Sequence, residues 1–228
     1  MSSRDQQLIN FQFDKNYAIE DFFVSKSNFF AFSLLDSWPK WEKNIVNVHG
    51  EKYCGKTHLS QIFIKKNKGI ILNAEKFQFN TEKNLRYYEN IILDDLDGGI
   101  DENSIFSLVN FVDQNSKYLI INSVIPFSKM KFKLKDLKSR AKNCLDARIE
   151  KPDDELIKVL ITKYLSDKQI KIDIKLVEFA VKRITRSYGK IFEFIYKIDE
   201  ISLKKKKSID QKTIKEALGI QLDKISNP

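Results

Sequence analysis

The stretch that decides the fold is Gly50-Glu51-Lys52-Tyr53-Cys54-Gly55-Lys56-Thr57, which fits the phosphate-loop pattern G-x-x-x-x-G-K-[ST] at every fixed position. An apolar run at residues 45–48 precedes it and predicts a buried strand, and a helical pattern at residues 58–64 follows it. In the order strand, loop, helix, backbone N–H groups and the helix N-terminus surround the phosphates of a nucleotide. An ordinary glycine turn before a helix is the alternative, but the flanking strand and helix favour binding of a nucleoside triphosphate or diphosphate.

Within this loop, Lys56 is expected to reach the β- and γ-phosphates and Thr57 to ligate Mg²⁺. The predicted cofactor is therefore ATP or ADP together with Mg²⁺. The residues expected to contact the nucleotide are those of the loop and the residue after it: Gly50, Glu51, Lys52, Tyr53, Cys54, Gly55, Lys56, Thr57 and His58.

Strand and helix patterns alternate along the first two thirds of the chain, and only helical patterns follow Pro152. The alternation predicts an α/β fold in which helices cover a parallel five-stranded sheet. The expected strands are residues 45–48, 70–73, 91–95, 118–122 and 147–149, and the expected helices beside the loop helix are 27–41, 102–115, 155–166, 174–184, 190–201 and 211–218. The predicted parts are an N-terminal segment (1–20), an α/β nucleotide-binding domain (21–150) and a helical lid domain (151–228).

Two carboxylates, Asp94 and Asp95, end the predicted strand at residues 91–95. At the tip of a buried strand opposite the phosphate loop, Asp94 would hold Mg²⁺ together with Thr57 and water. Asp95 would orient or deprotonate the attacking water. An acidic strand end on its own is common where strands meet turns, and the loop upstream is what favours a functional role.

The next predicted strand ends in Asn122-Ser123, where a polar side chain would hydrogen-bond the water or the γ-phosphate. The sequence does not distinguish which of these two residues takes this sensor role.

Two arginines follow at positions from which a guanidinium could contact a bound nucleotide. Arg140 precedes the fifth predicted strand, at the edge from which an arginine finger would reach a neighbour's nucleotide. Arg186 opens the third helix of the lid, from which a guanidinium would reach back to the phosphates of its own chain. A surface salt bridge is the simpler interpretation of either arginine alone; their order after the loop and the Asp-Asp strand favours function.

The composition of the chain also bears on binding of DNA, metals and membranes. The net charge is +9, but only six of the 40 basic residues are Arg, and a chain so rich in Lys, Ile, Asn and Phe indicates a broad compositional bias. Direct DNA binding is therefore expected to be weak or absent. Two cysteines give no disulfide framework or metal spacing. No apolar run approaches the ~20 residues of a membrane span, and the N-terminus lacks a signal-peptide layout, which together predict a cytoplasmic protein without a membrane partner.

The order of these features resembles an AAA+ ATPase, and its details resemble the DnaA-related family that inactivates the bacterial replication initiator, the Hda proteins. The similar stretches span nearly the whole chain: residues 20–28 and 38–41 before the loop, 91–95 at the Asp-Asp strand, Pro126 after the sensor strand, 137–140 around the arginine finger, and the lid as far as 208–218. The resemblance implies a weak ATPase that acts mainly by stimulating hydrolysis of ATP bound to the initiator DnaA, with Arg140 as the finger. Whether Arg140 acts on the initiator or on another copy in a homodimer stays open.

The resemblance also gives a meaning to an apolar patch near the N-terminus. The stretch 6–11 is similar to the hexapeptide by which this family docks on the DNA polymerase sliding clamp, and Gln6, Leu8, Ile9 and Phe11 occupy its positions. An extended terminal segment can insert an aliphatic and an aromatic anchor into a groove. The alternative is that these side chains pack on the chain's own core.

Some features depart from the family. Asn10 and Phe11 are not its commonest choices, and Cys54 is unusual within the phosphate loop. The initiator itself carries a helix-turn-helix domain after its lid, whereas this sequence ends at Pro228, so we expect a regulator of replication initiation rather than the initiator. The alternative function is an initiator-like or helicase-loader ATPase that acts on DNA, which the positive charge favours.

Overall fold

A computed structural model describes residues 17–97, 101–205 and 209–220. Five strands form one sheet, in the order β2-β3-β4-β1-β5, and every neighbouring pair is parallel. The strands are β1 (Ile45–His49), β2 (Ile70–Asn73), β3 (Asn90–Leu96), β4 (Tyr118–Ser123) and β5 (Leu145–Arg148). The predicted parallel five-stranded α/β fold is confirmed. All carboxyl ends share one edge of the sheet, and the loop that follows β1 opens there.

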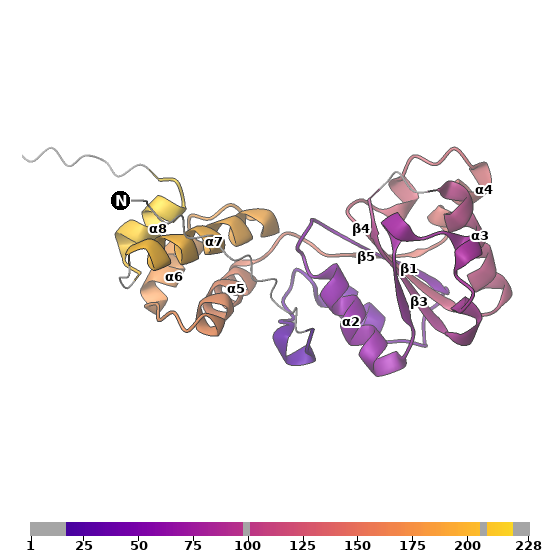
Figure 1. The fold of residues 1–228 in the computed structure, drawn as a ribbon, viewed down its shortest axis with the longest axis horizontal. Helices are drawn as coiled ribbons and strands as arrows, with labels where there is room; N and C mark the ends of the chain where they lie inside the picture. Colours follow the sequence, from indigo (N-terminus) through magenta and orange to yellow (C-terminus); the bar gives the residue numbers. More distant parts are fainter. Residues whose placement is uncertain (1–16, 98–100, 206–208, 221–228) are drawn as a thin grey trace, which may run out of the picture.

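Helices cover both faces of the sheet (Figure 1). Successive strand residues point to opposite faces, so β1 contributes Val46 and Val48 to one core and Ile45 to the other. The first core contains α1 (Phe29–Asp36) and α2 (Lys56–Asn67), and the second contains α3 (Glu102–Gln114) and α4 (Lys135–Lys142). The central strands are buried on both faces, which explains their continuous apolar sequence.

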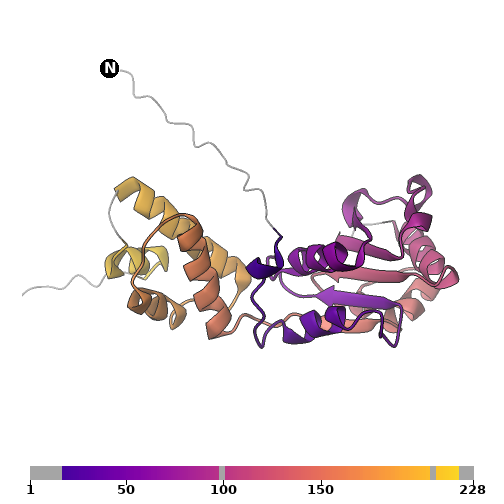
Figure 2. The ribbon, with the colours of Figure 1, turned by 90° about the horizontal axis from the view of Figure 1, so that it is seen from below.

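The remaining helices form a bundle at one end of the α/β part (Figures 1 and 2). They are α5 (Asp154–Asp167), α6 (Ile174–Val181), α7 (Tyr188–Lys205) and α8 (Gln211–Ala217), and they enclose a third core of their own. We call α5–α8 the helical unit. Asp153, Asp173 and Asp210 cap three of its helices, because each side chain accepts a hydrogen bond from a backbone N–H in the first turn.

No helix within the described ranges is long and apolar enough to cross a membrane.

The structure differs from the sequence prediction at α1, α4 and β5. Helix α1 ends at Asp36 rather than near residue 41, because Pro39 disfavours helical backbone in the residue before it. Helix α4 was not predicted, since only Leu137 and Ala141 of its eight residues are buried. Strand β5 begins at Leu145 rather than at residue 147; as an edge strand with only Ala147 buried, it has no apolar run to mark it.

Asp153 joins the helical unit to the α/β part. One carboxylate oxygen accepts the Leu156 N–H at 2.8 Å, and the other accepts the Ser27 N–H at 3.3 Å. We predict that Asp153→Ala lowers the free energy of unfolding by about 0.5–2 kcal/mol, the usual cost of a lost N-cap. Asp173→Ala is the matched control, since Asp173 caps α6 through the Lys175 N–H. Urea unfolding followed by circular dichroism measures both, and a smaller loss for Asp153→Ala than for Asp173→Ala would contradict the bridging role.

Candidate nucleotide-binding site

The loop between β1 and α2 requires glycine at two positions. A Cβ added at Gly50 would lie 2.8 Å from the Ile149 carbonyl oxygen and 3.0 Å from the Cys54 sulfur. Gly55 has φ +99°, in the left-handed region that glycine adopts at low cost, and it begins the turn into α2. The fixed glycines of the pattern are therefore explained by backbone geometry.

Lys56 is the first residue of α2, and it is buried. Its Nζ donates hydrogen bonds to the Gly50 and Glu51 carbonyl oxygens, both at 2.9 Å. These carbonyls hold the ammonium directly beneath the loop backbone, which is where a phosphate loop places its lysine against a polyphosphate.

A polar network joins α2, β3 and β4 beside Lys56. Thr57 Oγ1 donates to one Asp94 oxygen at 2.8 Å, and Asn122 Nδ2 donates to the other at 2.7 Å. Asn122 Nδ2 also donates to Ser60 Oγ at 2.7 Å. Asp94 and Asn122 are both buried, and hydrogen bonds to both Asp94 oxygens take the place of water there.

The structure distinguishes Asn122 from Ser123 by the direction of the side chains. Ser123 Oγ donates to the Ile125 carbonyl at 2.7 Å and accepts from Asn47 Nδ2 at 2.9 Å, on the other face of the sheet. Only Asn122 points toward Asp94. Its Oδ1 is a buried acceptor without a hydrogen-bond partner among the described residues, and such an atom is normally satisfied by a water or a ligand.

These residues fit a nucleotide with Mg²⁺. Thr57 and Asp94 supply hydroxyl and carboxylate oxygens, the hard ligands that Mg²⁺ prefers. Across the described ranges, no three His, Cys, Asp or Glu side chains cluster in a way that could hold a metal by themselves. A Mg²⁺ at this position would therefore be completed by water and phosphate oxygens, as is usual for this ion.

Asp95 follows Asp94 near the end of β3 and takes no part in this hydrogen-bond network. Its backbone has φ +60°, next to an irregularity in the β3–β4 register, and the residue is exposed. Partial desolvation and the neighbouring carboxylates of Asp94 and Asp97 raise the pKa of the Asp95 carboxyl above its usual range. A carboxylate shifted in this direction is a better proton acceptor.

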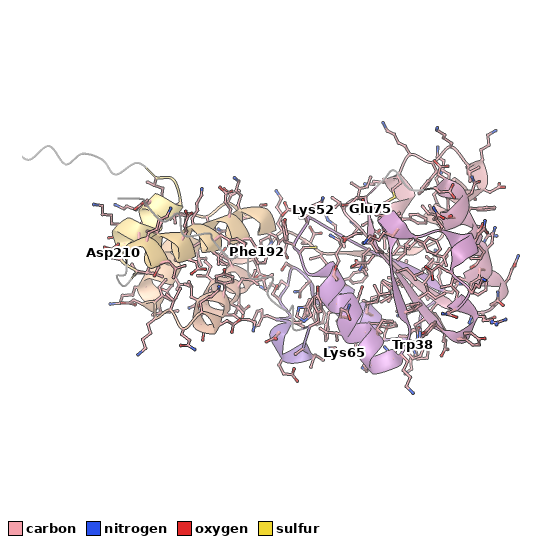
Figure 3. The ribbon with its side chains drawn as sticks, viewed as in Figure 1. Trp38, Lys52, Lys65, Glu75, Phe192 and Asp210 are labelled. Atoms are coloured by element: carbon pink, nitrogen blue, oxygen red, sulfur yellow. The ribbon has the colours of Figure 1, made fainter. Side chains whose placement is uncertain are left out.

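The variable positions of the loop contact the helical unit, which the sequence did not indicate. Glu51 Oε2 accepts the backbone N–H of Tyr188, the first residue of α7, at 3.0 Å. The ring of Tyr53 lies 5.5 Å from that of Phe192, also on α7. Figure 3 labels Phe192 and the loop residue Lys52 at this junction. No motif marks Tyr188 or Phe192, because their role depends only on where α7 begins.

His58 does not face the loop interior. Its Nε2 lies 2.9 Å from the Ala18 carbonyl oxygen, and its ring packs between those of Tyr17 and Phe22 at 5.4 and 5.3 Å. The structure therefore places His58 as an anchor for the segment that precedes α1.

Arg186 is held within the helical unit. Its Nη1 donates to the carbonyls of Val181 and Ile184 at 2.6 and 2.9 Å, and its Nη2 pairs with Asp154 at 2.6 Å. The guanidinium therefore fixes the turn before α7, and the structure does not bring it to the phosphate loop.

Arg140 lies at the opposite edge of the sheet from the loop. It pairs with Asp113 at the end of α3, and the other Asp113 oxygen accepts from Asn44 Nδ2 at 2.8 Å. Asn44 precedes β1 and Gly50 follows it, so about 20 Å of extended strand separates the two edges. Arg140 cannot serve the phosphate loop of its own chain.

Cys54 packs inside the loop, 4% exposed, with its sulfur 3.9 Å from Lys56 Nζ. Burial raises the pKa of the Cys54 thiol, so the side chain is a neutral packing group at neutral pH.

A cavity of about 460 Å³ opens next to the loop, between the ends of β4 and β5. Gly50 and Glu51 line it, as does the buried His49, whose Nε2 lies 3.0 Å from Asp146 Oδ2. Its lining includes neither Lys56 nor Thr57 nor Asp94, so the phosphate-binding groups gather outside it.

Comparison with solved structures identifies the architecture. Domain III of the replication initiation protein DnaA from Thermotoga maritima superposes with a TM-score of 0.71 at 20% identity, over 90% of this chain and 97% of that one. The chain has the AAA+ fold of DnaA domain III. The T. maritima Holliday-junction branch-migration motor RuvB is also similar, with a TM-score of 0.67 at 13% identity, over 90% of this chain and 72% of that one.

Sequence relatives are distant. The chromosomal replication initiator protein DnaA of Borreliella afzelii is 24% identical over 245 residues, covering 94% of this chain and 50% of that protein. The chain thus spans about half the length of the DnaA proteins that it matches. An uncharacterized protein of Haemophilus influenzae is 26% identical over 217 residues, covering 89% of this chain and 93% of that protein. No protein-family model matches the sequence.

Because the Asn122 amide contacts Asp94, we predict that the stability of one Asn122 variant depends on pH. Asn122→Asp places a second carboxylate beside Asp94, and like charges raise the pKa of the pair in the folded state above the unfolded value of about 4. The penalty is absent below that value and grows as the pH rises through the folded pKa, so the variant should lose about 1–4 kcal/mol of stability relative to wild type between pH 4 and pH 8.

Denaturant unfolding at several pH values measures this loss. Asn122→Ala is the control, since it removes the donor without adding a charge and should give a flatter profile. Equal profiles for the two variants would show that the amide does not face Asp94.

Proposed function

We propose that this protein is an AAA+ regulator of chromosomal replication initiation that binds ATP or ADP and stimulates hydrolysis of ATP held by the initiator DnaA. The position of Arg140 is the observation that carries this proposal. The side chain is 40% exposed, has one carboxylate partner in Asp113, and lies at the edge of the sheet remote from its own phosphate loop. An arginine so placed is available only to a nucleotide bound by another chain.

The phosphate loop supports the nucleotide part of the proposal. Lys56 would hold the β- and γ-phosphates, and Thr57 and Asp94 would hold Mg²⁺. The bound ion would neutralise charge on the phosphates. Asn122 would orient the attacking water through its unpartnered Oδ1, and Asp95, whose pKa is raised, would accept its proton. Arg186 would contact the phosphates only if it left its partners in the helical unit, which we infer to act as the lid.

Recruitment to the initiator would come from the N-terminal segment. Gln6, Leu8, Ile9 and Phe11 lie outside the described residues, so their docking on the sliding clamp rests on the sequence pattern alone. The first described residues run along α2, where Lys65 Nζ donates to the Tyr17 carbonyl at 2.9 Å. These activities belong in the cytoplasm.

An initiator-like ATPase or helicase loader is the second candidate, and the net charge of +9 is the observation that favours it. It differs from the first in requiring that DNA, rather than the initiator, stimulate turnover.

We expect Arg140→Ala to abolish stimulated hydrolysis of initiator-bound ATP, because a well-placed finger contributes roughly 10³–10⁵ in rate. Nucleotide binding by the variant itself should be unchanged, as measured by calorimetry. Arg86→Ala is the matched control, since Arg86 is also an exposed arginine at the amino end of the sheet, just before β3, where its Nη2 donates to Tyr87 Oη at 2.8 Å. If Arg140→Ala still stimulated hydrolysis of initiator-bound ATP fully, the finger would lie elsewhere or the mechanism would be wrong. If DNA alone stimulated ATP hydrolysis by this protein, the second candidate would be favoured.

Clamp docking is tested by removing residues 1–11. The truncated chain should retain its fold and nucleotide affinity but no longer co-elute with the sliding clamp, because its two apolar anchors are gone. The double variant Ile9→Ala, Phe11→Ala removes the aliphatic fourth and apolar last residues of the pattern and so separates anchor loss from truncation, and Gln7→Ala, at a position that the pattern leaves free, is the control. Clamp binding by the truncated chain would make the segment a structural one.

A further inference from the structure

The segment between β4 and β5 concentrates positive charge on one surface. Residues 129–142 contain six lysines, one arginine and a single acidic residue, Asp136. All six lysines are exposed. We call this set the lysine ridge: Lys129, Lys131, Lys133, Lys135, Lys138 and Lys142.

Packing of the intervening residues fixes the ridge on the outside. Met130, Phe132 and Leu134 alternate with the lysines and pack against the core beneath α3. Where the backbone is extended, every second residue points to the same side at intervals of about 7 Å. On α4, Lys135, Lys138 and Lys142 follow helical spacing on one face, while Leu137 and Ala141 are buried on the other.

The charges of the ridge are not paired. Within the described ranges, no ion pair joins any of the six lysines to a carboxylate. The nearby Glu102 accepts the backbone N–H groups of Lys133 and Leu134, at 2.9–3.0 Å. Glu102 and Asp136 offset part of the charge and leave a clear positive excess.

The lysines of α7 provide the contrast within the same chain. Lys190 and Lys197 both pair with Glu193, at 2.7 and 2.8 Å, and Lys204 pairs with Glu200 at 2.5 Å. Charge on α7 is thus matched on its own surface, whereas charge on the ridge is available to a partner.

The ridge is also distinct from the surface that presents Arg140. With about 100° between successive helix residues, Arg140 lies on the flank of α4 that faces Asp113 on α3. Lys138 and Lys142 lie on the other flank, roughly 160° away from Arg140 in projection. In Figure 1, α4 lies at the end of the molecule opposite the helical unit.

We propose that the lysine ridge binds the phosphate backbone of duplex DNA, independent of sequence. Six exposed lysines within 14 residues, with little acidic charge between them, suit the high linear charge density of a duplex. Binding of single strands uses exposed aromatic rings on which bases stack. The ridge offers none, because Phe127 is buried and Phe132 is half-buried against the core. This surface goes beyond the first proposed function, none of whose steps requires it, and it revises the expectation from composition that direct DNA binding is weak or absent.

The test is a salt titration of binding to a short fluorescent duplex by the full chain, read as anisotropy. The triple variant Lys131→Gln, Lys133→Gln, Lys135→Gln should reduce the slope of log K against log salt by about 2.7, which is 0.9 for each lost phosphate contact. Its affinity at low salt should fall by about tenfold or more.

The matched control removes the same charge from α7, as Lys190→Gln, Lys197→Gln, Lys204→Gln, and should keep the wild-type slope. Circular dichroism and ATP calorimetry check that both variants are folded. Arg140→Ala should bind the duplex normally, so failure of the finger and failure of the ridge are distinguishable. Equal losses in the two triple variants, tighter binding to a single strand of the same length, equal competition by polyglutamate, or no duplex binding at low salt would each overturn the proposal.

Discussion

The buried Asp94 carboxylate is the group on which the arrangement of the site depends. Thr57 of α2 and Asn122 of β4 donate to its two oxygens, so three elements meet at one side chain. A carboxylate taken out of water is costly unless its oxygens are satisfied, and here the hydrogen bonds that satisfy it also set where the loop helix sits on the sheet. Fold and site therefore share one interaction.

The nucleotide-binding groups and Arg140 lie at opposite ends of the central strand β1. The groups that would hold a nucleotide gather where β1 ends, and the arginine that would act on one lies where β1 begins. Under the proposed function, the first set would hold this chain's own nucleotide and Arg140 would act on one held by another chain.

Much of this could be predicted from the sequence, for reasons visible in particular residues. The central strands are buried on both faces, so their apolar runs mark them. The phosphate loop is marked by Gly50, where a Cβ would lie too close to the Ile149 carbonyl, and by Gly55, whose φ is positive. Helix α4 escaped prediction because its amphipathic signal rests on Leu137 and Ala141 alone. Asn122 and Ser123 could not be separated, since their difference is one of strand face. Ion pairs between residues far apart in the sequence, such as Arg140 and Asp113, could not be predicted because no local sequence pattern marks them.

The hydrogen bond from the Tyr188 N–H to Glu51 links the phosphate loop to helix α7. Glu51 belongs to the loop, and its carboxylate lies against the positive end of the dipole of the 18-residue helix α7. Further negative charge in the loop would repel Glu51 and weaken its hold on that helix. The charge of the loop would therefore set the strength of its link to α7 and, through α7, to the rest of the helical unit.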